Sequence, residues 1–265
     1  MDIGTGKDIV DYTVNGVAVP YHLIDIVDAG YKYNVYEFQK DFFAAFNQIT
    51  NKGKLPILCG GTGLYIESVV KSYNLQEVPI NQPLRDKLED KTIDELTGVL
   101  ASFKKPHNKS DFDSKKRTIR AIEIETYNQE NQIKITDFES INSLLIGIQY
   151  DRDFRRERIT ERLKSRLKSG MIEEVENLLK NGVEKETLLY YGLEYRYITL
   201  YITGEISYNE MYRQLEIAIH QFAKRQMTWF RGMERRGLNI HWFDGNMPMN
   251  DKLQQIVSLV NKEKS

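Results

Sequence analysis

A glycine-rich turn at residues 60–63 is the clearest candidate for chemistry in this sequence. The apolar run 54–60 is followed by Gly60-Gly61-Thr62-Gly63 and then by a helical pattern. Where a strand turns sharply into a helix, the first N–H groups of the helix are unpaired and its dipole favours negative charge. Glycines let the backbone approach a bound phosphate, and the Thr62 hydroxyl can donate to it. The turn therefore predicts an anion site, although a tight turn without a ligand explains the glycines equally well.

A row of arginines follows the apolar run 142–149. Arg155, Arg158, Arg162 and Arg166 recur at intervals of three and four residues, which places them along one side of a helix. Like charges four residues apart destabilise an isolated helix by roughly 0.2–0.5 kcal/mol per pair, and a bound anion would reverse that effect. Arginine suits phosphate geometry, and open α/β sheets bind ligands beyond the carboxyl ends of their strands. A solvated charged face is the alternative.

A second basic segment begins a helix near residue 115. Lys116, Arg117 and Arg120 lie where the helix dipole disfavours cations, so an external anion such as an RNA phosphate would account for them. By contrast, residues 4–7 lack the spacing, the following Ser or Thr and the preceding strand of a phosphate-binding P-loop, and we interpret them as a structural loop.

Apolar runs alternate with helical patterns, which predicts an α/β fold with a largely parallel sheet covered by helices. We expect strands at about residues 20–27, 54–60, 142–149 and 238–243. We expect helices at about residues 35–52, 63–72, 82–102 in one or two pieces, 113–127, 154–181 with a break near Gly170, 186–202, 207–232 and 250–262. Because no strand signal occurs between about residues 75 and 140, this stretch is expected to form a helical insertion.

Asp25 lies within the apolar run 22–26, where a buried carboxylate needs hydrogen-bond partners or a cation. We expect either a structural carboxylate or an indirect role in holding a metal ion. His22 is expected to be a satisfied core residue.

Composition restricts the class of protein. The chain has 265 residues, 41% of them hydrophobic, which is enough for a large core in one or two domains. Cys59 is the only cysteine, the start does not look like a signal peptide, and no apolar run approaches the ~18 residues of a membrane span, so we expect a cytoplasmic protein. The net charge of −1 argues against indiscriminate nucleic-acid binding, but residues 150–170 carry eight Lys and Arg against four Asp and Glu.

Five ordered segments resemble the tRNA dimethylallyltransferase family, also called tRNA isopentenyltransferases or IPP transferases. They are residues 1–7, 22–26, 55–65, 117–123 and 223–231. The resemblance implies a P-loop NTPase-like parallel sheet flanked by helices, with a core domain at 1–75 and 141–265 and a helical insertion domain at 76–140 that grips the anticodon arm. In the family, the P-loop and the segment with the catalytic base precede the residue that matches Met1, so the first strands are expected to be missing.

The resemblance also implies the reaction: transfer of a dimethylallyl group from dimethylallyl diphosphate to N6 of adenosine 37 in tRNA, with Mg²⁺ on the diphosphate. It implies a catalytic role for Thr62 and Arg162, and the metal, if one is held, would lie near Asp25. Matching diphosphate contacts come from Gly60, Gly61, Gly63 and Arg158. Matching tRNA contacts come from Arg85, Lys116, Arg117, Thr118, Ile119 and Arg120. The partners would be a tRNA anticodon stem-loop and the diphosphate substrate, bound by a monomer.

Two other functions stay open at this stage. The chain could prenylate free adenine nucleotides, like the related adenylate isopentenyltransferases, although the long basic insertion favours tRNA. It could also be a truncated RNA-binding chain without activity, because the family's base and P-loop lysine are absent from the sequence.

Overall fold

The computed structural model describes residues 1–103, 114–131 and 141–263. The chain divides into two compact units. The larger unit contains Met1–Lys71 and Ser140–Ser265, and the smaller unit contains Ser72–Glu139.

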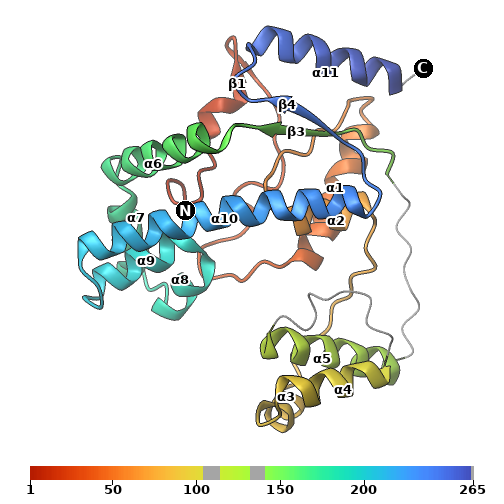
Figure 1. Cartoon of the computed structure of the whole chain (residues 1–265), viewed down its shortest axis with the longest axis vertical. Coiled ribbons are helices and arrows are strands. Elements are labelled where there is room, and N and C mark those ends of the chain that lie inside the picture. The colour runs from red at the N-terminus through yellow and green to blue at the C-terminus, as the bar shows by residue number, and fades with distance from the viewer. Residues whose placement is uncertain (104–113, 132–140, 264–265) are drawn as a thin grey trace. The chain divides into compact units, whose positions relative to one another are not determined.

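The larger unit begins with a short 3-10 helix, η1 (Ile9–Tyr12), and a small antiparallel hairpin of β1 (Thr13–Val14) and β2 (Val17–Ala18). Its α-helices are α1 (Val35–Thr50), α2 (Gly63–Val70), α6 (Arg152–Lys168), α7 (Met171–Lys180), α8 (Lys185–Tyr191), α9 (Leu193–Ile202), α10 (Tyr208–Arg235) and α11 (Met249–Glu263). A second sheet pairs β3 (Leu145–Gln149) with β4 (Ile240–Asp244) in parallel, and the two strands lie side by side (Figure 1).

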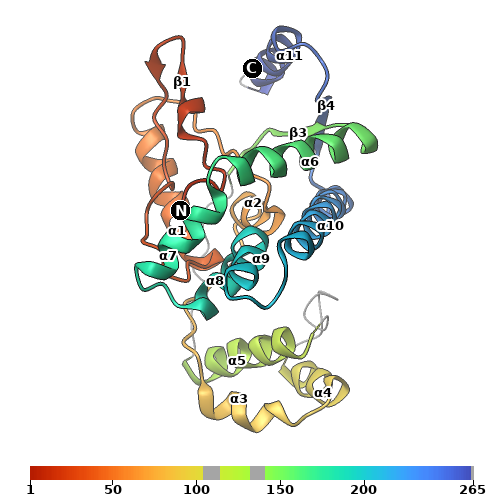
Figure 2. The ribbon, with the colours of Figure 1, turned by 90° about the vertical axis from the view of Figure 1, so that its left-hand side faces the viewer.

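The core of the larger unit lies among helices α6 to α10. Its buried side chains are Leu163, Met171, Val175, Leu188, Tyr195, Ile198, Met211 and Leu215. These residues recur at helical spacing, so each helix turns one apolar side toward the cluster. The long helix α10 packs against α6 and α9, and α2 packs between α1 and α10 (Figure 2). This arrangement brings the start of α2 against the side of α10.

Local signals in the sequence explain where the helices begin. Asn34 and Glu37 form a capping box at the start of α1, and Asp151 accepts the backbone N–H groups of residues 153 and 154 at the start of α6. The Ser207 side chain caps α10 in the same way. Gly170 separates α6 from α7 with a φ of 99°, a conformation that glycine adopts without strain.

The smaller unit contains α3 (Gln82–Glu89), α4 (Ile93–Phe103) and α5 (Lys115–Asn131). Its own apolar cluster consists of Leu88, Leu96, Leu100 and Ile122, with Ile119 among the partly buried residues packed against it. The described part of this unit contains no strand, as expected. Among the described helices of both units, none is long and apolar enough to cross a membrane.

Two of the four expected strands are wrong. Residues 20–27 and 54–60 are not strands, because neither has a neighbouring strand in the described structure, whose sheets pair only β1 with β2 and β3 with β4. The segment 20–27 also passes through positive φ at Leu23 and Asp25, which an extended strand does not allow. The strands near 142–149 and 238–243 are confirmed, and so are the expected helices, except that the one expected at 186–202 is two helices separated by Gly192. The molecule is a mostly helical α/β protein with a small parallel sheet.

Candidate functional site

The glycine-rich turn leads directly into α2, as predicted. Thr62 is the N-cap residue of α2, but its side chain makes no capping hydrogen bond. The Thr62 side chain is exposed, and the backbone N–H groups of Gly63 and Leu64 donate to no acceptor within the described residues. The Thr62 hydroxyl is thus exposed at the positive end of a helix dipole, and the two amides beside it have no acceptor among the described residues, although Gly63 itself is buried. An exposed hydroxyl beside the first amides of a helix suits an anion.

Side chains of α10 hold this turn from one side. The Gln226 amide donates to the Gly61 carbonyl at 2.9 Å, and the Trp229 ring covers Gly63 so closely that a Cβ there would overlap it. Gly60, by contrast, has open space where its Cβ would lie. Packing against α10 thus requires glycine at position 63, whereas at Gly61 only the flexible end of the Gln226 side chain would have to move. The sequence alone did not indicate this reason for Gly63. The signal was the spacing of Gln226 and Trp229, which puts both on one face of a helix.

The structure divides the predicted arginine row on α6. Arg166 lies against Gly6 and pairs with Asp8 at 3.1 Å, whereas Arg162 reaches the same carboxylate only at 3.5 Å. The Arg162 side chain is 61% exposed and that of Arg166 is 16% exposed. Burial, followed by the charge of Arg162, lowers the pKa of the Arg166 guanidinium. Arg166 therefore belongs to the packing of the loop, while Arg162 presents its charge to solvent.

Arg158 lies near the carboxyl ends of β3 and β4. Its Nη1 donates to the Tyr150 hydroxyl at 3.0 Å, and its guanidinium lies 4.9 Å from the centroid of that ring. Tyr150 lines a hollow of about 480 Å³ together with the last residues of the two strands, Gln149 and Asp244, and with Asp151 and Asn246 just beyond them. This is the edge of a parallel sheet at which ligands are expected. Within the described structure, no hydrogen bond or ion pair joins Arg158 or Arg162 to residues 60–63.

A carboxylate of α7 fixes the N-terminal loop. Glu174 accepts the backbone N–H groups of Asp2, Ile3 and Gly4 at 2.7, 2.8 and 3.2 Å, and the Tyr195 hydroxyl donates to it at 2.7 Å. Burial raises the pKa of Glu174, but these hydrogen bonds outweigh burial and the net shift is downward. The ionised carboxylate therefore anchors the loop on α7 and α9.

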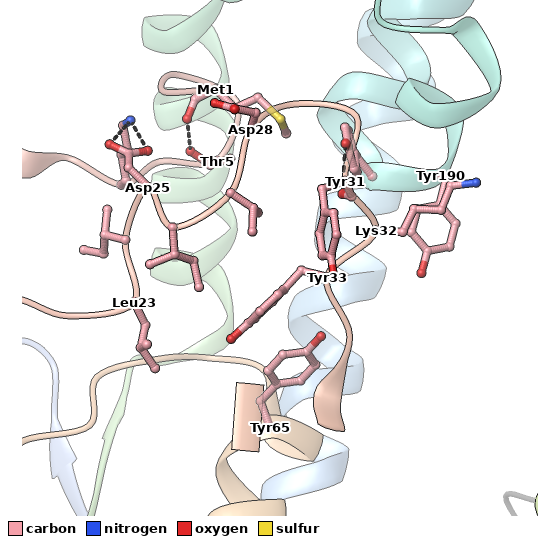
Figure 3. A pocket seen from close by; sticks show the side chains of 15 residues that line it. Met1, Thr5, Leu23, Asp25, Asp28, Tyr31, Lys32, Tyr33, Tyr65 and Tyr190 are labelled. Carbon is pink, nitrogen blue, oxygen red and sulfur yellow. Dashed lines mark hydrogen bonds and ion pairs between the residues drawn. The ribbon is translucent and has the colours of Figure 1, made fainter. Parts of the chain in front are cut away.

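A pocket of about 640 Å³ lies beside this loop (Figure 3). Residues from the segments 1–7 and 23–33 line it, together with Tyr65, Tyr190 and Tyr191. Figure 3 shows Tyr31, Tyr33 and Tyr65 among the side chains that line it. Aromatic walls with a few charged groups suit a planar or apolar ligand that carries a polar group. Because Tyr65 belongs to the first turn of α2, the pocket reaches the helix start that follows Thr62.

The expectation that Asp25 is buried within a strand is wrong. Its side chain is 55% exposed, its φ is 55°, and its carboxylate accepts hydrogen bonds from Lys7 Nζ at 2.6 Å. His22 is also exposed, not a core residue. The reason is the same for both: residues 20–27 cross the surface as a turning segment and have no partner strand in the described structure.

Two of the predicted RNA-binding arginines, in the smaller unit, share one carboxylate. Glu123 is 1% exposed and accepts Arg85 Nε and Nη2 at 2.9 Å, the Asn81 N–H at 2.6 Å and Arg120 Nη1. Burial raises the pKa of Glu123, but the hydrogen bonds from Arg85, Asn81 and Arg120 outweigh it and lower this pKa to about 2. Arg120 also donates to the Val78 carbonyl at 2.7 Å. Arg85 and Arg120 thus hold α3 and the preceding segment on α5.

The remaining predicted RNA contacts differ in exposure. Lys116 and Arg117 are exposed in the first turn of α5. Thr118 is fully buried, and Ile119 packs against the apolar cluster of the unit. A side-chain contact with RNA is therefore open to Lys116 and Arg117, while Thr118 and Ile119 support the helix from inside.

Comparison with known proteins identifies the family to which the chain belongs. The family model described as IPP transferase matches residues 1–233, and tRNA dimethylallyltransferase 2 of Phocaeicola vulgatus is 59% identical over 98% of this chain and 85% of its own length. The chain belongs to the tRNA dimethylallyltransferase (IPP transferase) family. Another member, tRNA dimethylallyltransferase 1 of Parabacteroides distasonis, is 57% identical over 99% of this chain and 86% of its own length.

Solved structures of the family have the same fold. The crystal structure of the full-length tRNA isopentenylpyrophosphate transferase from Bacillus halodurans matches with a TM-score of 0.69 and 28% identity, covering 99% of this chain and 83% of that chain. A eukaryotic dimethylallyltransferase acting on tRNA matches with a TM-score of 0.68 at 19% identity, which shows a likeness of fold. The predicted membership of this family is thereby confirmed.

The described residues do not assemble a cluster of metal ligands for the Mg²⁺ that the family resemblance implies. Within the described ranges, no group of three or more His, Cys, Asp or Glu side chains could hold a metal ion. Asp25, the predicted candidate, is neutralised by Lys7. Because Mg²⁺ in phosphate-binding sites is held largely by substrate phosphate oxygens and water, a cluster of protein ligands is not needed for it. We assign no resident metal and no step that depends on one.

Proposed function

We propose that this chain transfers a dimethylallyl group from dimethylallyl diphosphate to N6 of adenosine 37 in tRNA. The observation that carries this proposal is the 59% identity to tRNA dimethylallyltransferase 2 over 98% of the chain. In this reaction N6 attacks the primary allylic carbon, a C–N bond forms, the C–O bond to diphosphate breaks, and the N6 proton passes to a base. The reaction therefore needs a base, stabilisation of the leaving diphosphate, and alignment of the two reactants.

The residues of this chain are proposed to supply the second and third of these requirements. Thr62 and the amides at the start of α2 would bind oxygens of the diphosphate, since they are available and lie at the positive end of the helix dipole. The adjacent pocket would receive an aromatic or apolar part of the substrates, because its walls carry tyrosines. Mg²⁺ is kept as part of the substrate, whose diphosphate oxygens are its ligands. We assign no base among the described residues.

Arg162 is proposed to neutralise the leaving diphosphate. Arg162→Ala is expected to lower kcat/KM for dimethylallyl diphosphate by about 10- to 100-fold, the usual effect of losing a hydrogen bond to a charged group. Arg162→Lys should restore little, since lysine does not reproduce a bidentate contact. Steady-state rates with a stem-loop RNA and varied diphosphate substrate would measure both effects.

Arg166→Ala is the matched control on the same helix. Because Arg166 packs on Gly6 and pairs with Asp8, its loss should lower the melting temperature. It should lower kcat/KM much less than Arg162→Ala does. Equal losses of kcat/KM in the Arg162 and Arg166 variants would contradict a specific role for Arg162 and indicate a diffuse charged face.

We also propose that the smaller unit binds the anticodon arm through the exposed start of α5. Lys116 and Arg117 present positive charge where the helix dipole would otherwise disfavour it. An adenine in a loop leaves its stack at low cost, which allows the base to enter a pocket. RNA affinity should then fall steeply with added salt, because each phosphate contact releases counterions.

The proposed function is tested by incubating the chain with dimethylallyl diphosphate and an anticodon stem-loop that contains adenosine 37. Nucleoside mass spectrometry should detect N6-dimethylallyladenosine, and a stem-loop with guanosine at position 37 should give no product. Adenosine monophosphate is the second acceptor. Product on the mononucleotide alone would identify an adenylate isopentenyltransferase, and salt-dependent RNA binding without product would identify an RNA-binding chain without activity.

A further inference from the structure

A buried carboxylate lies on α2 one turn beyond the exposed helix start. Glu67 is fully buried, and Arg236 donates to it through Nε at 2.7 Å and Nη2 at 2.6 Å. Trp229 Nε1 donates to the same carboxylate at 2.9 Å. Lys71, after the end of α2, donates to the Arg236 carbonyl at 2.9 Å. The C-terminal end of α10 therefore holds α2 at two places.

Trp229 links this carboxylate to the glycine-rich turn. Its ring covers Gly63, and its Nε1 donates a hydrogen bond to Glu67. The orientation of the indole against Gly63 therefore depends on the hydrogen bond to Glu67. Gln226, one turn earlier on α10, holds the Gly61 carbonyl. Gln226 and Trp229 on α10 and Arg236 at its C-cap thus contact residues 61 to 67 from one side.

Thr62 lies inside this set of contacts but makes none with its own side chain. An N-cap threonine ordinarily accepts a hydrogen bond from the first turn of its helix, which would fix its hydroxyl locally. In this chain the orientation of the hydroxyl depends on the backbone of the turn, and the backbone depends on α10. A shift of α2 would therefore move the hydroxyl and the two available amides together.

We propose that Glu67, held by Arg236 and Trp229, is a positioning residue that sets the orientation of Thr62 toward the diphosphate. The inference rests on the proposed function, since it takes Thr62 to act at the reacting centre. Glu67 itself is fully buried and does not touch substrate. It acts through the Trp229 ring and the axis of α2.

Glu67→Gln is the informative substitution, because it keeps the shape of the side chain and removes its charge and one acceptor oxygen. It should lower kcat by about tenfold or more, as expected for a misaligned reacting group, and leave KM for the stem-loop RNA nearly unchanged. In a Thr62→Ala background, Glu67→Gln should cause no further loss of kcat, since the group that it positions is already absent. Arg236→Lys should show the same dependence on Thr62, because lysine cannot make both hydrogen bonds.

Ile198→Val is the matched control, because it weakens the buried core of the same unit away from α2. It should lower the melting temperature and leave kcat unchanged. Its effect on the melting temperature should be the same in the unsubstituted chain and in the Thr62→Ala background. If the double variant lost kcat by the product of the two single losses, the positioning role would be overturned. The effect of Glu67→Gln would then be a general effect on stability.

A readout without turnover separates this inference from the proposed function. Hydrogen–deuterium exchange in the peptide covering residues 59–66 should become at least several-fold faster in Glu67→Gln and stay unchanged in Ile198→Val. Affinity for inorganic diphosphate, measured by calorimetry, should fall in Glu67→Gln and in Thr62→Ala, and the double variant should bind no more weakly than Thr62→Ala. If the unsubstituted chain forms no prenylated RNA, the proposed function fails, while unchanged exchange and diphosphate affinity in Glu67→Gln would reject the positioning role by themselves.

Discussion

Thr62→Ala is expected to lower turnover by about 10²- to 10³-fold, the usual effect of removing one preorganised donor from a developing negative charge. The Thr62 hydroxyl is exposed at the start of α2 and does not cap its own helix, so its removal should cost little stability. Affinity for the stem-loop RNA should stay within about twofold, because the proposed RNA contacts lie on α5 and one lost donor at the reacting centre does not reach them. Single-turnover rates and RNA binding by fluorescence anisotropy would measure the two quantities.

Thr62→Ser is the matched control for this prediction. Serine keeps the hydroxyl and a similar preference for the N-cap, so it should retain most of the turnover. Unchanged turnover in Thr62→Ala, with a normal melting temperature, would remove Thr62 from the site. Equal losses in the alanine and serine variants would mean that the methyl group, and not the hydroxyl, matters.

Glu123→Ala is expected to destabilise the smaller unit by about 3 kcal/mol, as for other buried ion pairs that lose one partner. The substitution leaves Arg85 and Arg120 without their shared carboxylate and leaves the Asn81 N–H without an acceptor. Hydrogen exchange in peptides of α3 to α5, measured on the whole chain, should therefore become much faster. Glu130→Ala is the control, because Glu130 is an exposed glutamate on the same helix.

The stabilisation by Glu123 should also depend on pH. Its pKa in the folded chain is about 2, below the ordinary value of 4.5, so the folded state binds the proton more weakly than the unfolded state. The contribution is thus fully present above pH 4.5 and is lost as the pH falls from there toward 2. Glu123→Gln should remove this dependence in the exchange of α3 to α5. An unchanged acid dependence in that variant would show that other carboxylates cause it.

The Glu123 ion pairs also change the interpretation of the basic insertion. From sequence, Arg85 and Arg120 are equivalent to Lys116 and Arg117 as candidates for RNA phosphate. In the structure the first two are tied to a buried carboxylate, whereas the second two are exposed at a helix start. Loss of RNA affinity in an Arg85 variant would therefore need a measurement of folding beside it before it could be assigned to a contact.

Local patterns predicted the helices well because their signals are local. Asp151 and Ser207 are N-cap residues, Gly170 interrupts one long helical pattern, and apolar residues recur at helical spacing between them. The strands were harder to predict, because a strand requires a partner that no local pattern specifies. Residues 54–60 are as apolar as a buried strand, yet Ile57 is 83% exposed and the segment has no neighbouring strand in the described structure.

The candidate site shows the same limit. The turn at 60–63 was predicted as a helix start that suits an anion; the helix start is confirmed, and anion binding stays a prediction. The reason for its glycines was not predictable, because Gly61 and Gly63 face Gln226 and Trp229, which are distant in sequence. The prediction that Asp25 is a buried carboxylate was wrong for a related reason. Its partner, Lys7, belongs to a loop that is distant in sequence, and the apolar pattern of residues 20–27 gives no sign of that contact.

The strands β3 and β4 pair in parallel although helices α6 to α10 lie between them in the chain. Their backbone hydrogen bonds close a very long loop, and the entropy cost of closure rises with loop length. The intervening helices, in contrast, are joined by short connections and share one apolar cluster. We therefore expect these helices to assemble before the sheet during folding. They would then act as a template that brings Leu145 opposite Ile240, so that the register of the sheet is inherited from the packing of the helices.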